Sequence, residues 1–276
     1  MSNKAKLVYV LSLRNAAADK AGQPVDYKGQ PRYMKSPLEY LAQALDTTPL
    51  GDAYSLEGIV CDDDEHSPRD QAALADYGFS CSPDKPWIFP KDQRAQGRLL
   101  RDMLHAVPSS YRRLPLNDPG RVAGKSAFEH QLLDKLLTLQ ADVVVLDGLL
   151  VILDELVRPG SRFHRKIVNI HPGITRLESP FQRRGAYATL DALHGARGEK
   201  VVDWHAMTTV ATKPVVKTGA SLHYVDNGID SGEVIFDVLD TDIAPDDSIL
   251  ELRWNNFNRS LFPAMHQGLS LLAPHL

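Results

Sequence analysis

The sequence predicts an α/β fold built on a mostly parallel sheet, and three observations support this. Short apolar runs of strand length recur along the chain, and the run Ala141–Leu146 is typical of a strand buried on both faces of a parallel sheet. Segments with helical spacing of apolar residues separate these runs. The length of 276 residues suits one domain with insertions, or a core with a modest second lobe.

Composition and charge exclude several classes of protein. Hydrophobic residues make up 43% and charged residues 24%, which excludes a disordered, collagenous or coiled-coil chain. The formal net charge of −4 argues against nucleic acid or an anionic membrane as the main partner. Two cysteines, Cys61 and Cys81, are too few for a disulfide scaffold, and no apolar stretch reaches 18 residues. We therefore expect a cytoplasmic protein without a membrane segment.

The N-terminal third begins with a buried strand at residues 7–11. Residues 12–36 contain glycine and proline and show no period, so we expect a long loop there. Pro37 opens a helix whose apolar residues lie on one face, and residues 56–61 form the next strand. The acidic run 62–66 is either a metal site or a solvated loop, and the solvated loop is favoured.

The middle of the chain, residues 80–124, is rich in proline, arginine and glycine and is expected to be an insertion. Only residues 96–105 are compatible with a helix in this insertion. Residues 120–126 are one residue too short for a P-loop and follow no strand, which argues against a nucleotide site. Ser126 and Glu129 have capping-box spacing, so a helix is predicted to start at Ser126.

The C-terminal half continues the alternation of strands and helices. A buried strand is predicted at residues 167–170, and a pair of strands at 221–225 and 233–237. Apolar residues then recur at helical spacing from about residue 247 to 272, which predicts a terminal helix that packs on the core.

The strongest candidates for catalytic residues lie at the end of the strand 167–170. Asn169 and His171 share one side of that strand because side chains alternate, and ligands bind at the carboxyl ends of parallel strands. The ten histidines show no metal-ligand spacing, so no metal is expected. Asp230 follows 59 residues later in a turn-rich segment. A structural histidine at a strand end and an aspartate in a turn remain the alternative.

Taken together, these motifs resemble the formyltransferases that use 10-formyltetrahydrofolate. That family has a strand ending in Asn-x-His-Pro, then Gly-x-Ser/Thr-x-His-x-Val, then Asp-x-Gly and an apolar strand. The matching residues of this chain are Asn169, His171, Pro172, Gly219, Ser221, His223, Val225, Asp230 and Gly232. The resemblance implies a Rossmann-like formyltransferase fold and a single catalytic domain over residues 1–276, with insertions at about 12–36 and 80–124.

The resemblance also implies how the site would work. Asn169 and His171 would stabilise the oxyanion of a tetrahedral intermediate, while Asp230 would raise the imidazole pKa and relay a proton, without a metal. The folate pocket would be formed by two short segments: Leu149, Leu150, Val151 and Leu153, and Asp226, Asn227, Gly228 and Ile229. Core packing is the alternative for at least one of these leucines. Asp147 and Gly173 depart from the family pattern, which has a small residue and often serine at these positions.

The identity of the formyl acceptor distinguishes the members of this family. The chain lacks the glycine-rich phosphate loop after its first strand, which disfavours glycinamide ribonucleotide. A formyltetrahydrofolate deformylase would have a preceding regulatory domain and a His-His strand end. The insertion-rich front half most resembles the hydroxyornithine formyltransferases of pyoverdine siderophore biosynthesis, which implies N5-hydroxyornithine as acceptor and other siderophore-pathway enzymes as partners. Arg14 is a candidate ligand of the amino-acid carboxylate. A folate-binding regulatory protein without activity is the non-enzymatic alternative.

Overall fold

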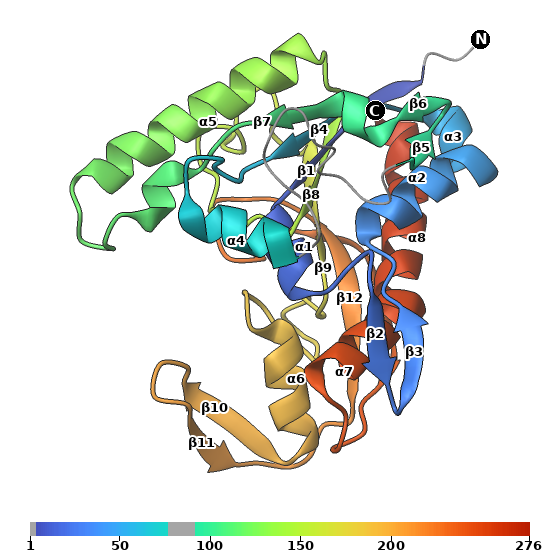
Figure 1. The fold of residues 1–276 in the computed structure, drawn as a ribbon, viewed down its shortest axis with the longest axis vertical. Helices are drawn as coiled ribbons and strands as arrows, with labels where there is room; N and C mark the ends of the chain where they lie inside the picture. Colours follow the sequence, from blue (N-terminus) through green and yellow to red (C-terminus); the bar gives the residue numbers. More distant parts are fainter. Residues whose placement is uncertain (1–3, 77–91) are drawn as a thin grey trace.

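The computed structural model describes residues 4–76 and 92–276. Its centre is a seven-stranded sheet in the order β13-β12-β9-β8-β1-β4-β7 (Figure 1). The strands are β1 (Ala5–Leu11), β4 (Tyr54–Cys61), β7 (Leu104–Ala106), β8 (Val143–Asp147), β9 (Ile167–His171), β12 (Lys217–Tyr224) and β13 (Val234–Asp242). The pairs among the first five are parallel, whereas β12 runs antiparallel to both β9 and β13. The predicted mostly parallel sheet and its core strands are therefore confirmed.

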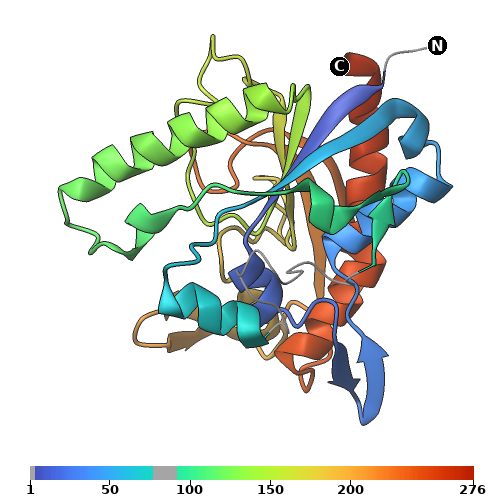
Figure 2. The same ribbon diagram turned by 45° about the horizontal axis from the view of Figure 1, so that its top comes forward.

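Helices cover both faces of the sheet, as Figures 1 and 2 show. The helices are α1 (Leu13–Ala18), α2 (Pro37–Thr47), α3 (Leu50–Ala53), α4 (Pro68–Asp76), α5 (Gly120–Thr138), α6 (Ala188–Ala196), α7 (Ile249–Asn256) and α8 (Phe262–Leu272). Helices α2 and α8 pack in the core on one face, and α5 packs on the other. Side-chain alternation divides each strand between these cores, so that Tyr9 faces α8 while Val8 and Val10 face α5. We call the two sides the α8 face and the α5 face.

The segment 12–36 contains regular structure, so the predicted long loop is wrong. Helix α1 follows β1 directly, and β2 (Pro24–Tyr27) pairs with β3 (Gln30–Tyr33) in an antiparallel hairpin. Arg32 of this hairpin lies over the rings of Tyr27 and Trp254, the latter on α7. The hairpin gives no alternating pattern because nearly all of its side chains are exposed.

The insertion at 80–124 also differs from expectation where it is described, from residue 92 onward. Cys81 lies outside the described residues. The predicted helix at 96–105 is wrong: this stretch contains the second strand of the short pair β5 (Arg94–Ala95) and β6 (Arg98–Leu99), a single 3₁₀ turn, Leu100–Met103, and the edge strand β7. A second 3₁₀ turn, Ser110–Arg113, precedes α5.

Helix α5 begins at Gly120, after Pro119, and not at Ser126, so the predicted capping box is wrong. Residues 120–126, which have a P-loop-like sequence, form its first turns. The Glu129 carboxylate instead accepts the backbone N–H groups of Asp154 and Glu155 at 2.8 to 3.1 Å. The helix thereby fixes the segment that follows β8.

The C-terminal prediction is confirmed. Residues 249–272 form α7 and α8, joined without a break by one π-helical turn, Phe257–Leu261. The strand pair β12–β13 is present, and a smaller hairpin, β10 (Glu199–Asp203) with β11 (Thr208–Ala211), projects from the body. Among the described residues, we find no helix whose length and apolarity would let it cross a membrane.

Candidate active site

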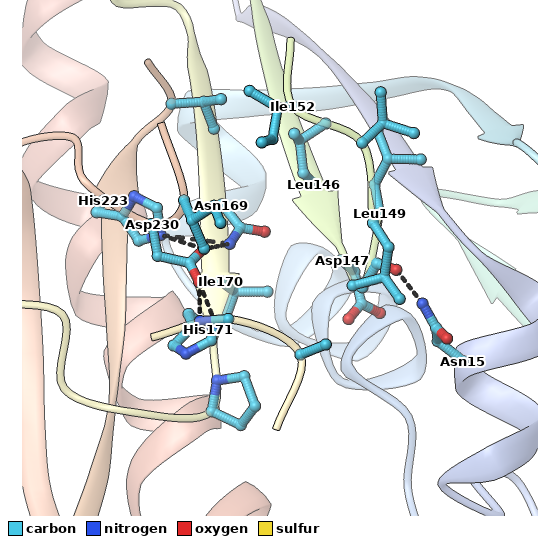
Figure 3. Close-up of a pocket in the computed structure, with 18 of the residues that line it drawn as sticks. Asn15, Leu146, Asp147, Leu149, Ile152, Asn169, Ile170, His171, His223 and Asp230 are labelled. Carbon is cyan, nitrogen blue, oxygen red and sulfur yellow. Dashed lines mark hydrogen bonds and ion pairs between the residues drawn. The ribbon is translucent and has the colours of Figure 1, made fainter. Parts of the chain in front are cut away.

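A cavity of about 400 Å³ opens at the carboxyl ends of β8 and β9, where the chain connecting β12 to β13 meets them (Figure 3). Its wall includes ten of the eleven residues predicted for catalysis and folate binding: Leu149, Leu150, Val151, Leu153, Asn169, His171, Asp226, Gly228, Ile229 and Asp230. Asn227 is the one that does not line it. The structure therefore brings together three segments, residues 149–153, 169–171 and 226–230.

We call Asn169, His171, His223 and Asp230 the candidate catalytic cluster, and Asp230 contacts each of the other three. Its Oδ1 accepts a hydrogen bond from Asn169 Nδ2 at 3.2 Å and lies 3.5 Å from His223 Nε2. Its Oδ2 accepts the Gly185 N–H at 2.7 Å and lies 3.4 Å from His171 Nδ1. Figure 3 shows Asp230 facing Asn169 and His171 from the opposite chain segment.

Backbone geometry explains why these side chains converge. Asn169 and His223 are paired residues of the antiparallel strands β9 and β12, so their side chains share a face. Asp230 has a φ of 46°, a left-handed conformation that aspartate tolerates better than most residues. Gly232 is required because a Cβ there would lie 1.8 Å from the Tyr224 carbonyl oxygen. The Asp-x-Gly motif thus fixes where the Asp230 carboxylate points.

The electrostatics of the cluster favour an ionised Asp230 beside a neutral His171. Burial raises the pKa of Asp230, but hydrogen bonding to His223, the charge that His171 carries when protonated, and the Gly185 N–H outweigh it and hold that pKa well below its usual range. Burial lowers the pKa of His171, and it outweighs the opposing effect of Asp230. The expectation that Asp230 raises this imidazole pKa therefore describes one contribution, and the net shift is downward.

The surroundings of His171 also select its tautomer. Nε2 lies 3.1 Å from the Arg183 carbonyl oxygen, which can only accept a hydrogen bond. The ionised Asp230 carboxylate, 3.4 Å from Nδ1, can also only accept, so the neutral ring donates to one of these two groups, and the shorter contact favours a proton on Nε2 with Nδ1 unprotonated and facing Asp230. Gly173 makes this contact possible, because a Cβ there would lie 2.7 Å from the same carbonyl oxygen and 3.2 Å from Nε2. This accounts for the departure from serine at position 173.

The amide of Asn169 is already engaged. Its Nδ2 donates to Asp230 and lies 3.3 Å from His223 Nε2, so that Oδ1 is turned toward the cavity (Figure 3). The His223 ring is oriented by Nδ1, which donates to the Tyr224 carbonyl oxygen at 2.8 Å. For Asn169 to donate to a developing oxyanion, its amide has to turn.

The segment after β8 forms an apolar wall on the α5 face. Leu153 is fully buried and belongs to the core, whereas Leu150 is 58% exposed and free to contact a ligand. Ile229, also 58% exposed, lines the cavity from the other segment. Asn15 Nδ2 donates to the Gly148 carbonyl oxygen and thereby tethers the start of the wall to α1. Two exposed apolar side chains are suited to hold a flat aromatic ligand.

Sequence reasoning missed a second group of polar side chains in this cavity. We call it the polar cluster, and it consists of Asn15, Asp19, Asp147 and Arg253. Burial raises the pKa of Asp147 to about 7 against the opposing effect of the Tyr9 hydrogen bond, and the charge of Asp19 adds to the rise. Burial likewise raises the pKa of Asp19, to about 6, although Arg253 opposes it. The departure from a small residue at position 147 was the only sequence signal.

Arg14 and the acidic run do not belong to the cavity. Asp62, Asp63 and Asp64 are buried, so the expected solvated loop is wrong. Arg14 pairs with Asp62 at 3.1 Å, with Asp63 at 2.9 Å and with Asp70 at 3.5 Å, which commits its guanidinium to this network. The prediction that Arg14 binds a substrate carboxylate is therefore wrong. Within the described ranges, no three His, Cys, Asp or Glu side chains are arranged to hold a metal ion.

The chain is similar to formyltransferases of known sequence and structure. The formyl transferase family model matches residues 87–264. A solved structure of PvdF of pyoverdin biosynthesis, described as an N10-formyltetrahydrofolate-dependent formyltransferase, is 64% identical, with a TM-score of 0.91 over 98% of this chain and 99% of that one.

More distant structures share the fold. Phosphoribosylglycinamide formyltransferase from Anaplasma phagocytophilum is 18% identical, with a TM-score of 0.53 over 99% of this chain and 89% of that one. Formyltetrahydrofolate deformylase from Burkholderia mallei is 16% identical, with a TM-score of 0.53 over 99% of this chain and 66% of that one. The matched region contains Asn169, His171, His223 and Asp230, and the chain belongs to the formyl transferase family.

Proposed function

We propose that this enzyme transfers the formyl group of 10-formyltetrahydrofolate to the side-chain hydroxylamine nitrogen of N5-hydroxyornithine. The observation that carries the proposal is the cluster of Asn169, His171 and Asp230 at the carboxyl end of β9, in a chain 64% identical over nearly its whole length to PvdF. We propose that residues 1–276 act as one catalytic domain. A cytoplasmic location and contacts with other siderophore-pathway enzymes are part of the same proposal.

The reaction requires one bond exchange and one proton transfer. The lone pair of N5 attacks the formyl carbon, the new N5–C bond forms, and the bond from that carbon to N10 of the folate breaks. The proton lost by N5 is regained at N10, so the products are the N5-formyl hydroxamate and tetrahydrofolate. A hydroxylamine nitrogen is largely unprotonated at neutral pH and is a competent nucleophile.

Residues of the cluster suit the proton transfer. The unprotonated Nδ1 of His171 can accept the proton from N5, and the adjacent Asp230 carboxylate stabilises the imidazolium that results. Because burial lowers the pKa of His171, the imidazolium readily gives the proton up again to the leaving N10. Asn169 donates a hydrogen bond to the tetrahedral oxyanion once its amide has turned Nδ2 toward the cavity.

The folate is placed against the apolar wall formed by Leu149, Leu150 and Val151, with the segment 226–229 on the other side. Backbone N–H and C=O groups of both segments supply partners for the pterin edge. Leu153 lies behind this wall in the hydrophobic core. The choice of acceptor has further support, because the chain after β1 forms α1 instead of a glycine-rich loop.

Mass spectrometry of the products tests the proposal. The purified enzyme is given 10-formyltetrahydrofolate with N5-hydroxyornithine, ornithine, glycinamide ribonucleotide or water alone. We expect a formyl adduct on hydroxyornithine only. Free formate in every mixture would identify a deformylase. Bound folate without any product would favour a regulatory protein, and either result would reject the proposal.

A further inference from the structure

The cavity extends around the carboxyl ends of β8 and β9 to the α8 face of the sheet. Asn169 and His171 lie on the α5 side of β9, since Val168 and Ile170 belong to the core of the α8 face. Asp147 is the register partner of Ile170, so its side chain lies on the α8 face, where it accepts a hydrogen bond from Tyr9. The polar cluster therefore occupies a half of the cavity that the catalytic residues and the apolar wall leave free.

No basic side chain of the described residues pairs with the carboxyl group of Asp147, so this group is suited to bind a positively charged ligand. Its Oδ2 accepts the Tyr9 hydroxyl at 2.8 Å, and no cationic side chain in residues 4–76 or 92–276 lies at ion-pair distance. The neighbouring Asp19 adds a second negative group. A half-buried carboxylate in these surroundings is costly to ionise, and a positively charged ligand lowers that cost.

Arg253, from α7, has N–H groups that are not paired with another residue of the described chain. A guanidinium carries five N–H groups, of which one is directed to Asp19. The Nε atom is buried and has no hydrogen-bond partner in the described part of the chain. Because Arg253 lines the cavity, a ligand carboxylate can take the remaining donors.

The spacing of these groups matches an amino acid of ornithine length. Asp147 lies beside Ile170, which immediately precedes His171, but the Asp147 and His171 side chains point to opposite faces, so the strand spacing of about 4.8 Å is only a lower bound on the distance between the two groups. Five bonds separate the α-nitrogen of N5-hydroxyornithine from N5, a reach of about 6 Å when extended. Contacts of about 3 Å at each end extend this reach to about 12 Å, which lets an acceptor bound at Asp147 pass around the strand ends to the Asn169 and His171 side of the same cavity.

We propose that Asp147 binds the α-ammonium group of the acceptor and that Arg253, oriented by Asp19, binds its α-carboxylate. The acceptor then lies on the α8 face and the folate on the α5 face, and N5 meets the formyl carbon at the sheet edge between them. This inference rests on the proposed function, and it defines the acceptor class as free α-amino acids with a nucleophilic nitrogen at the far end of the side chain.

Acceptors that lack one of the two charged groups test each contact separately. Asp147→Asn is compared with the wild type using N5-hydroxyornithine and 5-(hydroxyamino)pentanoic acid, which lacks the α-amino group. We expect the KM for N5-hydroxyornithine to rise about 30-fold or more, as for a buried charge pair that loses one partner. The KM for the pentanoic acid should be the same in both proteins.

Arg253→Gln is tested with N-hydroxyputrescine, which lacks the carboxylate. We expect this variant to lose affinity for N5-hydroxyornithine and to keep its KM for N-hydroxyputrescine. Asp134→Asn, an exposed position on α5, is the matched control and should leave all values unchanged. Equal rises in KM for the intact and the truncated acceptors, or no rise in KM for either, would overturn the proposal.

Calorimetry separates a failure of this inference from a failure of the proposed function. Ornithine carries both charged groups, so it should bind the wild type and not Asp147→Asn, whether or not any formyl transfer occurs. Circular dichroism and folate binding establish that the variant is folded. Absence of ornithine binding to the wild type, or equal binding to both proteins, would overturn the assignment of the polar cluster.

Discussion

Replacing Asp147 by asparagine is expected to change how the stability of the protein depends on pH. Burial raises the pKa of this carboxyl from 3.8 to about 7. Between these values, the folded protein holds a proton that the unfolded chain has released. Stability therefore falls as pH rises through this window, and it levels off once both states are ionised. Asparagine can still accept the Tyr9 hydrogen bond but cannot ionise.

The size of the effect follows from the shift in pKa. A difference of about 3 units at about 1.4 kcal/mol per unit amounts to about 4 kcal/mol between pH 4 and pH 8. Asp19, whose pKa is raised to about 6, contributes with the same sign in both proteins and largely cancels in the comparison. The wild type should thus lose up to about 4 kcal/mol relative to Asp147→Asn over this range.

Urea unfolding at several pH values measures this difference. The free energies of unfolding of the wild type and Asp147→Asn should diverge steadily between pH 4 and pH 7 and run parallel above pH 8. Asp134→Asn, at an exposed position, should follow the wild type throughout. Parallel curves for the wild type and Asp147→Asn would mean that Asp147 is not held in a costly environment, and the reasoning about the polar cluster would fail.

Three further substitutions probe the rest of the molecule. His171→Ala should lower kcat at least about 100-fold while the folate Kd from calorimetry changes little, and a nearly normal kcat would remove the proton-transfer role. Gly173→Ser should push away the Arg183 carbonyl oxygen, 2.7 Å from the new Cβ, and lower kcat about 10- to 100-fold in a folded protein; unchanged kinetics would contradict the tautomer argument. Arg14→Met should cost about 3–5 kcal/mol in urea unfolding because buried carboxylates lose their partner, whereas a cost below about 1 kcal/mol would refute the buried network.

The strands of the sheet were predictable because burial on both faces requires continuous apolar runs. Val143–Asp147 and Ile167–His171 lie close to the predicted ranges for this reason. The hairpin β2–β3 was not predictable, since its side chains are mostly exposed and it packs on Trp254, more than 200 residues away. Edge strand β7 has three residues, too few to show a period.

The candidate site was predictable only where its residues are close in sequence or belong to a motif. Asn169 and His171 share a strand, and Asp230 lies in a motif with its own spacing. The pair of Asp19 and Arg253 is separated by 234 residues, so nothing local connects them. The buried aspartates 62–64 were misjudged because their partners, including Arg14 and Arg113, come from other segments.

The central claim, that the formyl group passes to a hydroxylamine nitrogen and not to water, is tested most directly by stoichiometry. Hydroxamate, detected by its coloured iron(III) complex, and tetrahydrofolate are measured in one reaction with limiting N5-hydroxyornithine. If the claim is correct, one hydroxamate forms for each tetrahydrofolate and the reaction stops when the acceptor is consumed. Tetrahydrofolate that accumulates without hydroxamate, and continues to form without acceptor, would contradict it.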